Sequence, residues 1–190
     1  MRLVLATRNA HKLSELSDLL DPLELIPLPE GFALPPETGT TFAENALLKA
    51  RAAALAGSRP AIADDSGIEA SALGGAPGVR SARFAGERAS DADNLDKLLR
   101  ELAPHADRAV AYTCVLAYVE PGGDEVCFEG RCEGTLALAA RGEGGFGYDP
   151  AFLPREGDGR TMAELPAAEK HAISHRGRAA RAFLGWLGDR

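Results

Sequence analysis

The chain has 190 residues, of which 45% are hydrophobic and 26% are charged, a composition typical of a soluble globular protein that buries one substantial core. Its formal net charge of −7 leaves no basic surplus to neutralise phosphates over a broad surface, so we expect no binding to nucleic acid or to anionic membranes. No segment approaches the ~20 apolar residues of a membrane span, and the apolar run at the N-terminus is too short for a signal peptide. We therefore expect a cytoplasmic protein with one domain spanning residues 1–190.

A strand followed by a helix opens the chain. Leu3-Val4-Leu5-Ala6 has the pattern of a buried strand, and leucines at positions 13, 16, 19 and 20 recur at helical spacing until Asp21-Pro22. The segment from Thr7 to Lys12 therefore lies at a helix N-terminus, where backbone N–H groups and the helix dipole favour an anion. Lys12 adds a full positive charge there. The alternative is an ordinary loop with a solvated lysine.

The second predicted helix carries polar residues on one face. Residues 22–40 hold five prolines and no sustained periodicity, which indicates an extended segment that carries Glu37-Thr38-Gly39. Thr41-Phe42-Ala43-Glu44 has the pattern of a capping box and opens the helix. Asn45 and Lys49 are four residues apart and share one face of it. In the alternative interpretation, Glu44 is only the cap, and Asn45 and Lys49 form a solvated face.

Two adjacent carboxylates follow a short apolar strand. Ala61-Ile62-Ala63 indicates a buried strand, and Ser66-Gly67 is interpreted as the turn that ends it. Asp64 and Asp65 then lie at a strand end, where neighbouring anions repel by on the order of a few kcal/mol, which favours raised pKa values or a bound cation. Magnesium is the candidate cation, since it takes oxygen ligands and often only one or two carboxylates together with phosphates. The alternative is a solvated Asp-Asp turn that caps the strand.

The central part of the chain predicts a hairpin. Ala109 to Val119 and Glu125 to Leu136 are strand-like and are joined by Pro121-Gly122-Gly123-Asp124, which predicts an antiparallel pair in a mixed sheet. Before this hairpin, the glycine-rich segment from Gly74 to Phe84 is expected to border a site, and leucines at positions 95, 98, 99 and 102 mark a helix. The three cysteines, at positions 114, 127 and 132, form no CxxC pair and are expected to be reduced thiols.

A second glycine-rich loop, from Gly142 to Pro150, presents two aromatic rings and a carboxylate. It contains a GxGxxG match, but the dinucleotide-binding form of this motif needs a following helix, and here Pro150 and Phe152 continue an extended chain. The glycines beside Phe146 and Tyr148 let the backbone approach a flat ligand closely, which suits base stacking. The alternative is a structural loop anchored by its aromatic residues.

The last predicted helix starts with two cations. Ser174 fits an N-cap, which puts His175 and Arg176 in the first helical turn. A cation at this position is unfavourable for the helix dipole by up to ~1 kcal/mol unless an acceptor offsets it, which indicates a ligand. The alternative is a pair of surface cations tolerated at small cost.

These segments together supply carboxylates from two places, lysines at separate helix positions, glycine-rich loops with aromatic residues, and a helix start rich in donors. Such a set fits a magnesium-bound nucleoside triphosphate. It does not fit the P-loop folds, because the chain contains no GxxxxGK[ST] motif.

Seven motifs, taken in chain order, resemble the inosine triphosphate pyrophosphatase family and span nearly the whole chain. Each motif is weakly specific alone, but their ordered combination is specific. The motifs are Thr7-Arg8-Asn9-Ala10-His11-Lys12, Glu37-Thr38-Gly39, Thr41-Phe42-Ala43-Glu44-Asn45-Ala46 with Lys49-Ala50, Ala63-Asp64-Asp65-Ser66-Gly67, Gly74-Gly75-Ala76-Pro77-Gly78, Gly145-Phe146-Gly147-Tyr148-Asp149-Pro150 and Ser174-His175-Arg176-Gly177. One position departs from the pattern, because Arg8 stands where many relatives have glycine.

The resemblance implies a homodimeric enzyme that hydrolyses the non-standard purine nucleoside triphosphates ITP, dITP and XTP to the monophosphate and pyrophosphate with Mg²⁺. It implies an α/β fold in which helices flank a central mixed twisted sheet, with the active site in a cleft between a main lobe and a smaller lobe. By similarity, Asp65 is the proton acceptor and a metal ligand, and Glu37 is a second acidic group near the metal. The residues expected to contact the substrate are Thr7, Arg8, Asn9, Ala10, His11, Lys12 and Lys49 for the phosphates, Ser66 beside Asp65, and Phe146, Gly147, Tyr148, Asp149, Lys170, His175 and Arg176 for the base. Asp64, Glu44 and Asn45 are expected to support them.

Cleavage between the α and β phosphates needs an in-line water, a base, and neutralisation of the charge that develops on pyrophosphate. Asp65 can orient and deprotonate the water, and Lys12 and Lys49 can stabilise the leaving group. Selectivity requires donors for the 6-oxo group of the purine, which adenine lacks, and His175 and Arg176 provide donors. Guanine must be refused at its 2-amino group.

Two alternative functions stay open from the sequence. One is a pyrophosphatase for other modified nucleotides, such as the modified pyrimidines associated with the structurally related septum-formation-inhibitor family. The other is a nucleotide-binding module without catalysis. The Asp64-Asp65 pair favours turnover, since a pure binder gains little from carboxylates near phosphates without a metal.

Overall fold

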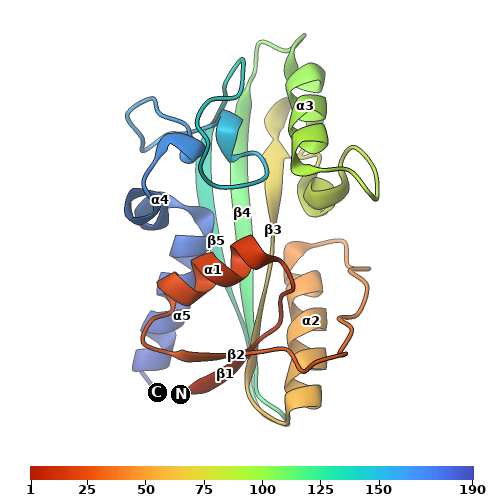
Figure 1. Cartoon of the computed structure of the whole chain (residues 1–190), viewed down its shortest axis with the longest axis vertical. Helices are drawn as coiled ribbons and strands as arrows, with labels where there is room; N and C mark the ends of the chain where they lie inside the picture. Colours follow the sequence, from red (N-terminus) through yellow and green to blue (C-terminus); the bar gives the residue numbers. More distant parts are fainter. The chain divides into compact units, whose positions relative to one another are not determined.

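The computed structural model describes all residues from Met1 to Arg190, and the chain forms two compact units (Figure 1). Neither unit is continuous in sequence. Unit 1 consists of Met1–Asp65, Cys114–Gly130 and Arg176–Arg190, and unit 2 consists of Ser66–Thr113 and Arg131–His175. Whether the two units act as the single domain expected from the sequence stays a prediction.

Six strands form one mixed sheet, which confirms the predicted α/β architecture. Their order in the sheet is β2-β1-β3-β4-β5-β6. Strand β1 pairs with β2 and with β3 in parallel, whereas β5 pairs with β6 antiparallel. The strands are β1 (Arg2–Leu5), β2 (Glu24–Pro27), β3 (Ala61–Ala70), β4 (Ala109–Val119), β5 (Glu125–Leu136) and β6 (Phe152–Pro154).

The predicted hairpin is confirmed with the predicted bounds. Strands β4 and β5 are neighbours in the sheet, and the turn between them is closed by a hydrogen bond from the Glu120 N–H to the Asp124 carbonyl (2.9 Å). All three cysteines are free thiols, as predicted.

Strand β3 is longer than the sequence pattern predicts. It runs without interruption from Ala61 to Ala70, so the prediction that Ser66-Gly67 ends it is wrong. The two carboxylates lie inside the strand and are buried. They do not break it because cationic and amide side chains from other elements balance their charge, and Ile68 and Ala70 extend the apolar pattern beyond them.

Strand β2 is a short edge strand inside the proline-rich segment that was predicted only as extended. It pairs with β1 from Arg2↔Glu24 to Leu5↔Pro27. Pro27 has no backbone N–H to donate, and proline is tolerated in a sheet mainly on an edge strand such as this one.

In unit 1, helices cover both faces of the sheet. These helices are α1 (Ala10–Leu19), α2 (Phe42–Gly57) and α5 (His175–Gly188), whose first residue belongs to unit 2. Leu16 of α1 and Phe183 of α5 join Leu3 and Leu5 of β1 in one apolar cluster. Because side chains alternate along a strand, Val4 points to the opposite face, where a Cβ on Gly57 of α2 would lie 2.9 Å from it. Figure 1 shows α1 and α5 on one side of these strands and α2 on the other.

Unit 2 has its own apolar core. Helix α3 (Asp91–Leu102) buries leucines against Tyr112 of β4 and Phe152 of β6. Its N-terminus has a capping box formed by Ser90 and Asp93. The other helical segments are α4 (Ala167–Ile173) and the 3-10 helices η1 (Ser71–Leu73), η2 (Gly78–Arg83), η3 (Asp149–Ala151) and η4 (Met162–Glu164).

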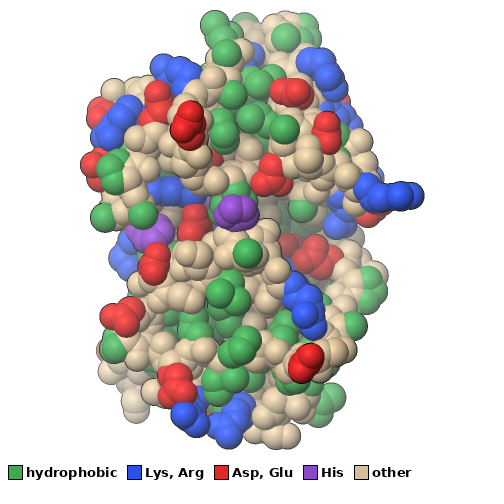
Figure 2. Space-filling view, in the orientation of Figure 1, with side chains coloured by type: hydrophobic (Ala, Val, Ile, Leu, Met, Phe, Trp, Pro, Cys, Tyr) green, Lys and Arg blue, Asp and Glu red, His purple; other side chains and the backbone are tan.

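The helices and the visible surface give no sign of a membrane span or of a continuous basic patch. None of the helices is both long enough and apolar enough to cross a membrane. On the face shown in Figure 2, Lys and Arg side chains are interspersed with Asp and Glu side chains. The expected lack of nucleic-acid binding stays a prediction.

Candidate active site

The loop between β1 and α1 is organised around the N-terminus of α1. Asn9 is the N-cap, and its side-chain oxygen accepts hydrogen bonds from the N–H groups of His11 (2.9 Å) and Lys12 (3.1 Å). The Asn9 N–H in turn donates to Thr7 Oγ1 (3.2 Å). The predicted helix N-terminus is therefore confirmed, and the Asn9 side chain accepts hydrogen bonds from two of its backbone N–H groups. The phosphate contacts expected of Thr7 to Lys12 stay a prediction.

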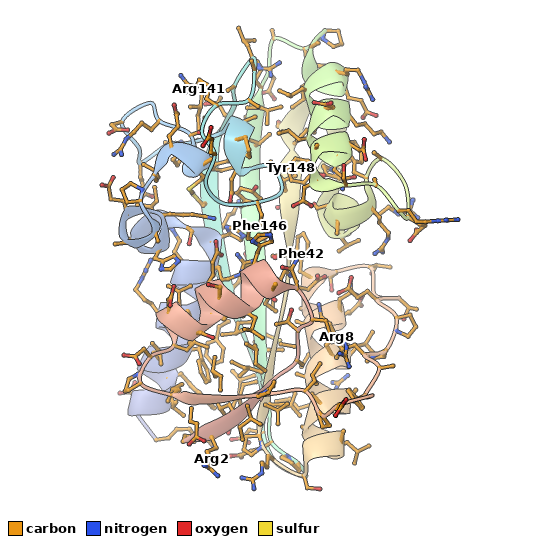
Figure 3. The ribbon with its side chains drawn as sticks, viewed as in Figure 1. Arg2, Arg8, Phe42, Arg141, Phe146 and Tyr148 are labelled. Carbon is orange, nitrogen blue, oxygen red and sulfur yellow. The ribbon has the colours of Figure 1, made fainter.

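Arg8, the departure from the family pattern, connects two segments of unit 1. Its guanidinium donates to the backbone carbonyl of Phe32 in the segment between β2 and α2. Figure 3 shows the Arg8 side chain on the side of unit 1 where this segment lies. Arg8 thus links the loop before α1 to the segment that also carries Glu37.

The N-terminus of α2 has the predicted capping box. Thr41 Oγ1 accepts from the Glu44 N–H (3.2 Å), and Glu44 Oε2 accepts from the N–H groups of Thr40 (2.6 Å) and Thr41 (3.1 Å). These donors lower the pKa of Glu44. Glu44 is therefore the helix cap, whereas Asn45 and Lys49 on the same helix are buried, so a solvated face is excluded for both.

Asp65 lies among side chains from α2 and from the segment before it. Asn45 Nδ2 donates to Asp65 Oδ2 (3.0 Å), and Lys49 Nζ lies 3.6 Å from Asp65 Oδ1 and 2.6 Å from Glu37 Oε1. Asn45 is itself oriented by the Gly39 N–H, which donates to its Oδ1 (2.8 Å). Only glycine fits at position 39, because a Cβ there would lie 2.7 Å from that oxygen and 2.6 Å from the Glu44 Cβ. The glycine of the Glu37-Thr38-Gly39 motif is therefore required on steric grounds.

Asp64 has different partners, and two of them are cations. Lys12 Nζ lies 2.9 Å from Asp64 Oδ2, and Arg176 Nη2 lies 3.3 Å from the same oxygen. Arg176 also binds Glu15 through Nη1 (2.5 Å). The Asp64 side chain is 0% exposed and that of Arg176 is 2% exposed, so this is a fully buried ion pair.

The two adjacent carboxylates consequently differ in acidity. Burial raises the pKa of Asp64, but Lys12, Arg176 and Lys49 lower it by more, so the pKa lies well below its usual value. Burial also raises the pKa of Asp65, and here Lys49 offsets the effect only in part while Glu37 adds to it, so the pKa is raised. Asp64 stays ionised as an internal counter-charge, and Asp65 is the carboxylate suited to accepting a proton.

Two carboxylates in unit 1 could hold a cation. Glu37 and Asp65 both lie next to the Lys49 ammonium, so their oxygens converge on one region. Burial lowers the pKa of Lys49, but Asp64, Asp65 and Glu37 more than offset this effect and raise it. No group of three or more His, Cys, Asp or Glu side chains is arranged to hold a metal on its own. The donor set therefore fits Mg²⁺, which commonly takes one or two carboxylates and completes its coordination with phosphates and waters.

The aromatic loop in unit 2 is organised around Asp149. Asp149 Oδ2 accepts from Lys170 Nζ (2.7 Å) and from the Phe146 N–H (2.9 Å). The Lys170 ammonium also lies 5.3 Å from the centroid of the Phe146 ring. Gly145, with φ +69°, has no room for a Cβ because it would meet the Asp149 carboxylate. The glycines of this loop thus allow the backbone to wrap closely around one carboxylate.

Two further contacts hold the same loop. The Tyr148 hydroxyl donates to the Ser81 carbonyl (2.7 Å), and the Gly147 N–H donates to Asp91 Oδ2 at the start of α3 (2.9 Å). Figure 3 shows Phe146 and Tyr148 on the loop that follows β5. Ser81 belongs to the glycine-rich segment that was predicted to border a site, and that segment follows η1 and contains η2.

Many of the predicted site residues lie in two clusters, together with Glu15 and Tyr112, which were not predicted. The carboxylate cluster in unit 1 consists of Lys12, Glu15, Glu37, Asn45, Lys49, Asp64, Asp65 and Arg176, and the Asp149 cluster in unit 2 consists of Tyr112, Phe146, Asp149, Lys170 and His175. Ser66 is the first residue of unit 2 after Asp65, and His175 is the last residue of unit 2 before Arg176. The predicted pairing of His175 and Arg176 as donors to a base therefore stays a prediction, since Arg176 binds carboxylates of unit 1.

Three residues that contact these clusters or the aromatic loop were not predicted from the sequence. Glu15 lies one helical turn after Lys12, a spacing that could have suggested it. Tyr112 looks like an ordinary aromatic residue of a buried strand, and Asp91 like an ordinary acidic residue in a first helical turn. Neither carries a local signal of its contacts with Asp149 and Gly147.

Comparison with known proteins places the chain in a family. Residues 3–186 match the sequence profile of the Ham1 family. A dITP/XTP pyrophosphatase of Geobacter sulfurreducens is 49% identical over 196 residues, covering 98% of each chain. A dITP/XTP pyrophosphatase of Streptomyces coelicolor is 51% identical over 191 residues, covering 96% of this chain and 95% of the relative. The structure of a HAM1 protein from Coxiella burnetii has a TM-score of 0.90 at 43% identity and covers 100% of both chains. These matches confirm the resemblance drawn from the motifs, and with a profile that covers residues 3–186 the chain belongs to the Ham1 family.

Proposed function

We propose that this protein hydrolyses the non-standard purine nucleoside triphosphates dITP, XTP and ITP to the nucleoside monophosphate and pyrophosphate. The names of its relatives support this substrate class. The observation that carries the proposal is the contrast between Asp64 and Asp65. One carboxylate is neutralised within the protein, and its neighbour has a raised pKa beside a buried lysine.

The carboxylate cluster can perform the steps that anhydride cleavage requires. Asp65 accepts a proton from the attacking water, and Asn45 holds the Asp65 carboxylate through Oδ2 (3.0 Å). Lys49, kept protonated by its acidic neighbours, offers a positive charge to the pyrophosphate leaving group. Lys12 and the N-terminus of α1 add further positive potential for the phosphates.

We propose Mg²⁺ as the cofactor, with Glu37 and Asp65 as its protein ligands. Their oxygens converge beside Lys49, and an oxygen donor set of this size suits magnesium in the presence of a triphosphate. When bound, Mg²⁺ would supply charge neutralisation for the phosphate oxygens. Asp64 does not belong to this donor set, because its Oδ2 oxygen is occupied by Lys12 and Arg176.

We propose that the Asp149 cluster recognises the base. Lys170 and His175 carry N–H donors that match the 6-oxo group of hypoxanthine and xanthine, whereas the 6-amino group of adenine is itself a donor. The Phe146 ring offers a stacking surface. A site that hydrogen-bonds its substrate rejects a mismatched analogue by as much as ~10⁴, because buried donors are left unpaired.

The proposal is tested by measuring the products formed from each nucleotide. With MgCl₂ present, we expect pyrophosphate release from dITP, XTP and ITP to exceed that from ATP and GTP by orders of magnitude. Asp65→Asn should abolish turnover, and the matched control Asp18→Asn, at an exposed position on α1, should leave it unchanged. Orthophosphate as the first product would contradict the assigned cleavage, and equal rates with GTP would contradict the specificity.

The same assay, extended to modified pyrimidine nucleotides and to a measurement of nucleotide binding, distinguishes the alternative functions. Turnover only of modified pyrimidine nucleotides would indicate a pyrophosphatase for other bases. Tight nucleotide binding without product would indicate a binding module. The homodimer expected from the family resemblance is tested separately by sedimentation equilibrium.

A further inference from the structure

Tyr112 contacts two members of the Asp149 cluster in two different ways. It lies on β4 with 7% of its surface exposed, and its hydroxyl donates to Asp149 Oδ1 (3.2 Å). Its ring stacks on the His175 ring with the centroids 4.5 Å apart and the planes within 10°. On Phe152 it packs at 4.6 Å with a tilt of 33°. One side chain therefore touches both a carboxylate and an imidazole of the proposed base site.

The hydroxyl of Tyr112 completes the coordination of a buried carboxylate. Asp149 is 3% exposed, and its Oδ2 accepts from Lys170 and from the Phe146 N–H. Both of these donors bind the same oxygen, so they leave rotation of the carboxylate about its bond to Cβ less restricted. The Tyr112 hydroxyl binds the other oxygen and removes that freedom. Burial and the nearby Asp149 raise the pKa of Tyr112 well above its usual value, so the hydroxyl stays a donor.

We propose that Tyr112 is a positioning residue for purine recognition, which orients the Lys170 ammonium through Asp149 and the His175 imidazole through stacking. The inference rests on the proposed function and deepens it. Tyr112 acts on the two N–H donors that would read the 6-oxo group, without itself belonging to the donor set. It links them inside unit 2, because Asp149, Lys170 and His175 all belong to that unit.

A buried tyrosine that binds a carboxylate also contributes to stability, so the test must separate positioning from folding. Tyr112→Phe removes only the hydroxyl and keeps the stacked ring. Tyr118→Phe is the matched control, because Tyr118 is also buried, packs against aromatic rings and donates a hydrogen bond from its hydroxyl to Glu120 Oε1 (2.8 Å). Tyr118 contacts neither cluster, so this control reports the cost of losing a comparable hydroxyl elsewhere.

The measurements separate the effect of each variant on recognition of the base from its effect on binding of the phosphates. For Tyr112→Phe we expect KM for XTP and ITP to rise about tenfold, the size associated with loss of a hydrogen bond to a charged group, with kcat changed by less than about threefold. Calorimetry should show weaker binding of inosine monophosphate and unchanged binding of inorganic pyrophosphate. Tyr118→Phe should leave all of these values unchanged. Tyr112→Leu, which also removes the ring, should weaken inosine monophosphate binding further than Tyr112→Phe.

Each contrary outcome has a separate meaning. Failure of the unmodified protein to release pyrophosphate from XTP or ITP would overturn the proposed function. An active protein in which Tyr112→Phe behaves like Tyr118→Phe would overturn the positioning role alone. Equal losses of inosine monophosphate and pyrophosphate binding would also overturn it, since a general loss of structure affects both ligands. Equal effects of Tyr112→Phe and Tyr112→Leu would remove the part of the proposal that concerns His175.

Discussion

The buried ion pair between Arg176 and Asp64 leads to a quantitative stability prediction. Replacing Arg176 with Met removes the charge and keeps much of the apolar stem. Asp64, with its side chain 0% exposed, then loses a partner that lies 3.3 Å away. We expect unit 1 to be destabilised strongly, because the carboxylate left behind has little access to water.

The structure sets the size of this effect. Removing one partner of a buried ion pair costs about 3–5 kcal/mol. Lys12 remains 2.9 Å from Asp64, and the Glu15 side chain is 14% exposed and can be partly rehydrated. Both facts place the effect of Arg176→Met near the lower end of this range, at a loss of about 3 kcal/mol in the free energy of unfolding.

The chain offers a direct assay for unit 1. Its one tryptophan, Trp186, lies on α5 and packs against Tyr118 and Phe183. Urea unfolding followed by tryptophan fluorescence therefore reports on the unit that contains Arg176. Arg181→Met, at an exposed position on the same helix, is the matched control and should change the free energy of unfolding by less than about 1 kcal/mol.

A double-mutant cycle isolates the pair. Because Asp64→Asn removes the stranded charge, the double variant Arg176→Met/Asp64→Asn should be more stable than the sum of the single losses by at least about 1 kcal/mol. The reasoning is refuted if Arg176→Met loses less than about 1 kcal/mol, or if the two losses simply add. Unchanged stability together with lost preference for ITP would instead support base recognition by Arg176.

Three further predictions concern the carboxylate cluster. Although burial raises the pKa of Asp64, its cationic neighbours hold it below the ordinary 3.8, so its contribution to stability is complete above that pH and is lost as the pH falls below it. Urea unfolding between about pH 6 and pH 3 should show this loss in the unmodified protein and a smaller loss in Asp64→Asn. Gly39→Ala should lower pyrophosphate release at least about tenfold, because the added Cβ displaces Asn45. The control Gly185→Ala, where a Cβ meets nothing within 4 Å, should be neutral or stabilising. Equal activities of the two variants would contradict the steric argument. Chelation of Mg²⁺ should stop turnover, and Glu37→Gln should raise the Mg²⁺ concentration needed for half-maximal rate about tenfold, which an unchanged magnesium titration would disprove.

Local patterns predicted the parts of the fold that local interactions determine. Strands β4 and β5 could be placed with their bounds because the apolar run of β4, the alternation of β5 and the proline-glycine turn between them each depend on neighbouring residues. The capping box at Thr41 likewise depends on residues three apart. These elements need no information from distant parts of the chain.

The length of β3 could not be predicted in the same way. Two adjacent aspartates look like a turn in a sequence, and they remain inside a strand only because Lys12, Asn45, Lys49 and Arg176 reach them from other elements. The same limit applies to the site. The residue types were identified from motifs, but which cation would neutralise which carboxylate depends on tertiary contacts that no single segment contains.

The discontinuity of the two units has a consequence for how the chain folds during synthesis. Unit 1 contains Arg176–Arg190 as well as Met1–Asp65, so the ribosome must synthesise this late segment before the unit can close. Until then, the partly made chain carries Asp64 without the arginine that neutralises it and lacks the aromatic residues of α5. We expect nascent chains that stop before residue 176 to leave unit 1 open to proteases, and variants that lack residues 176–190 to lose the carboxylate cluster.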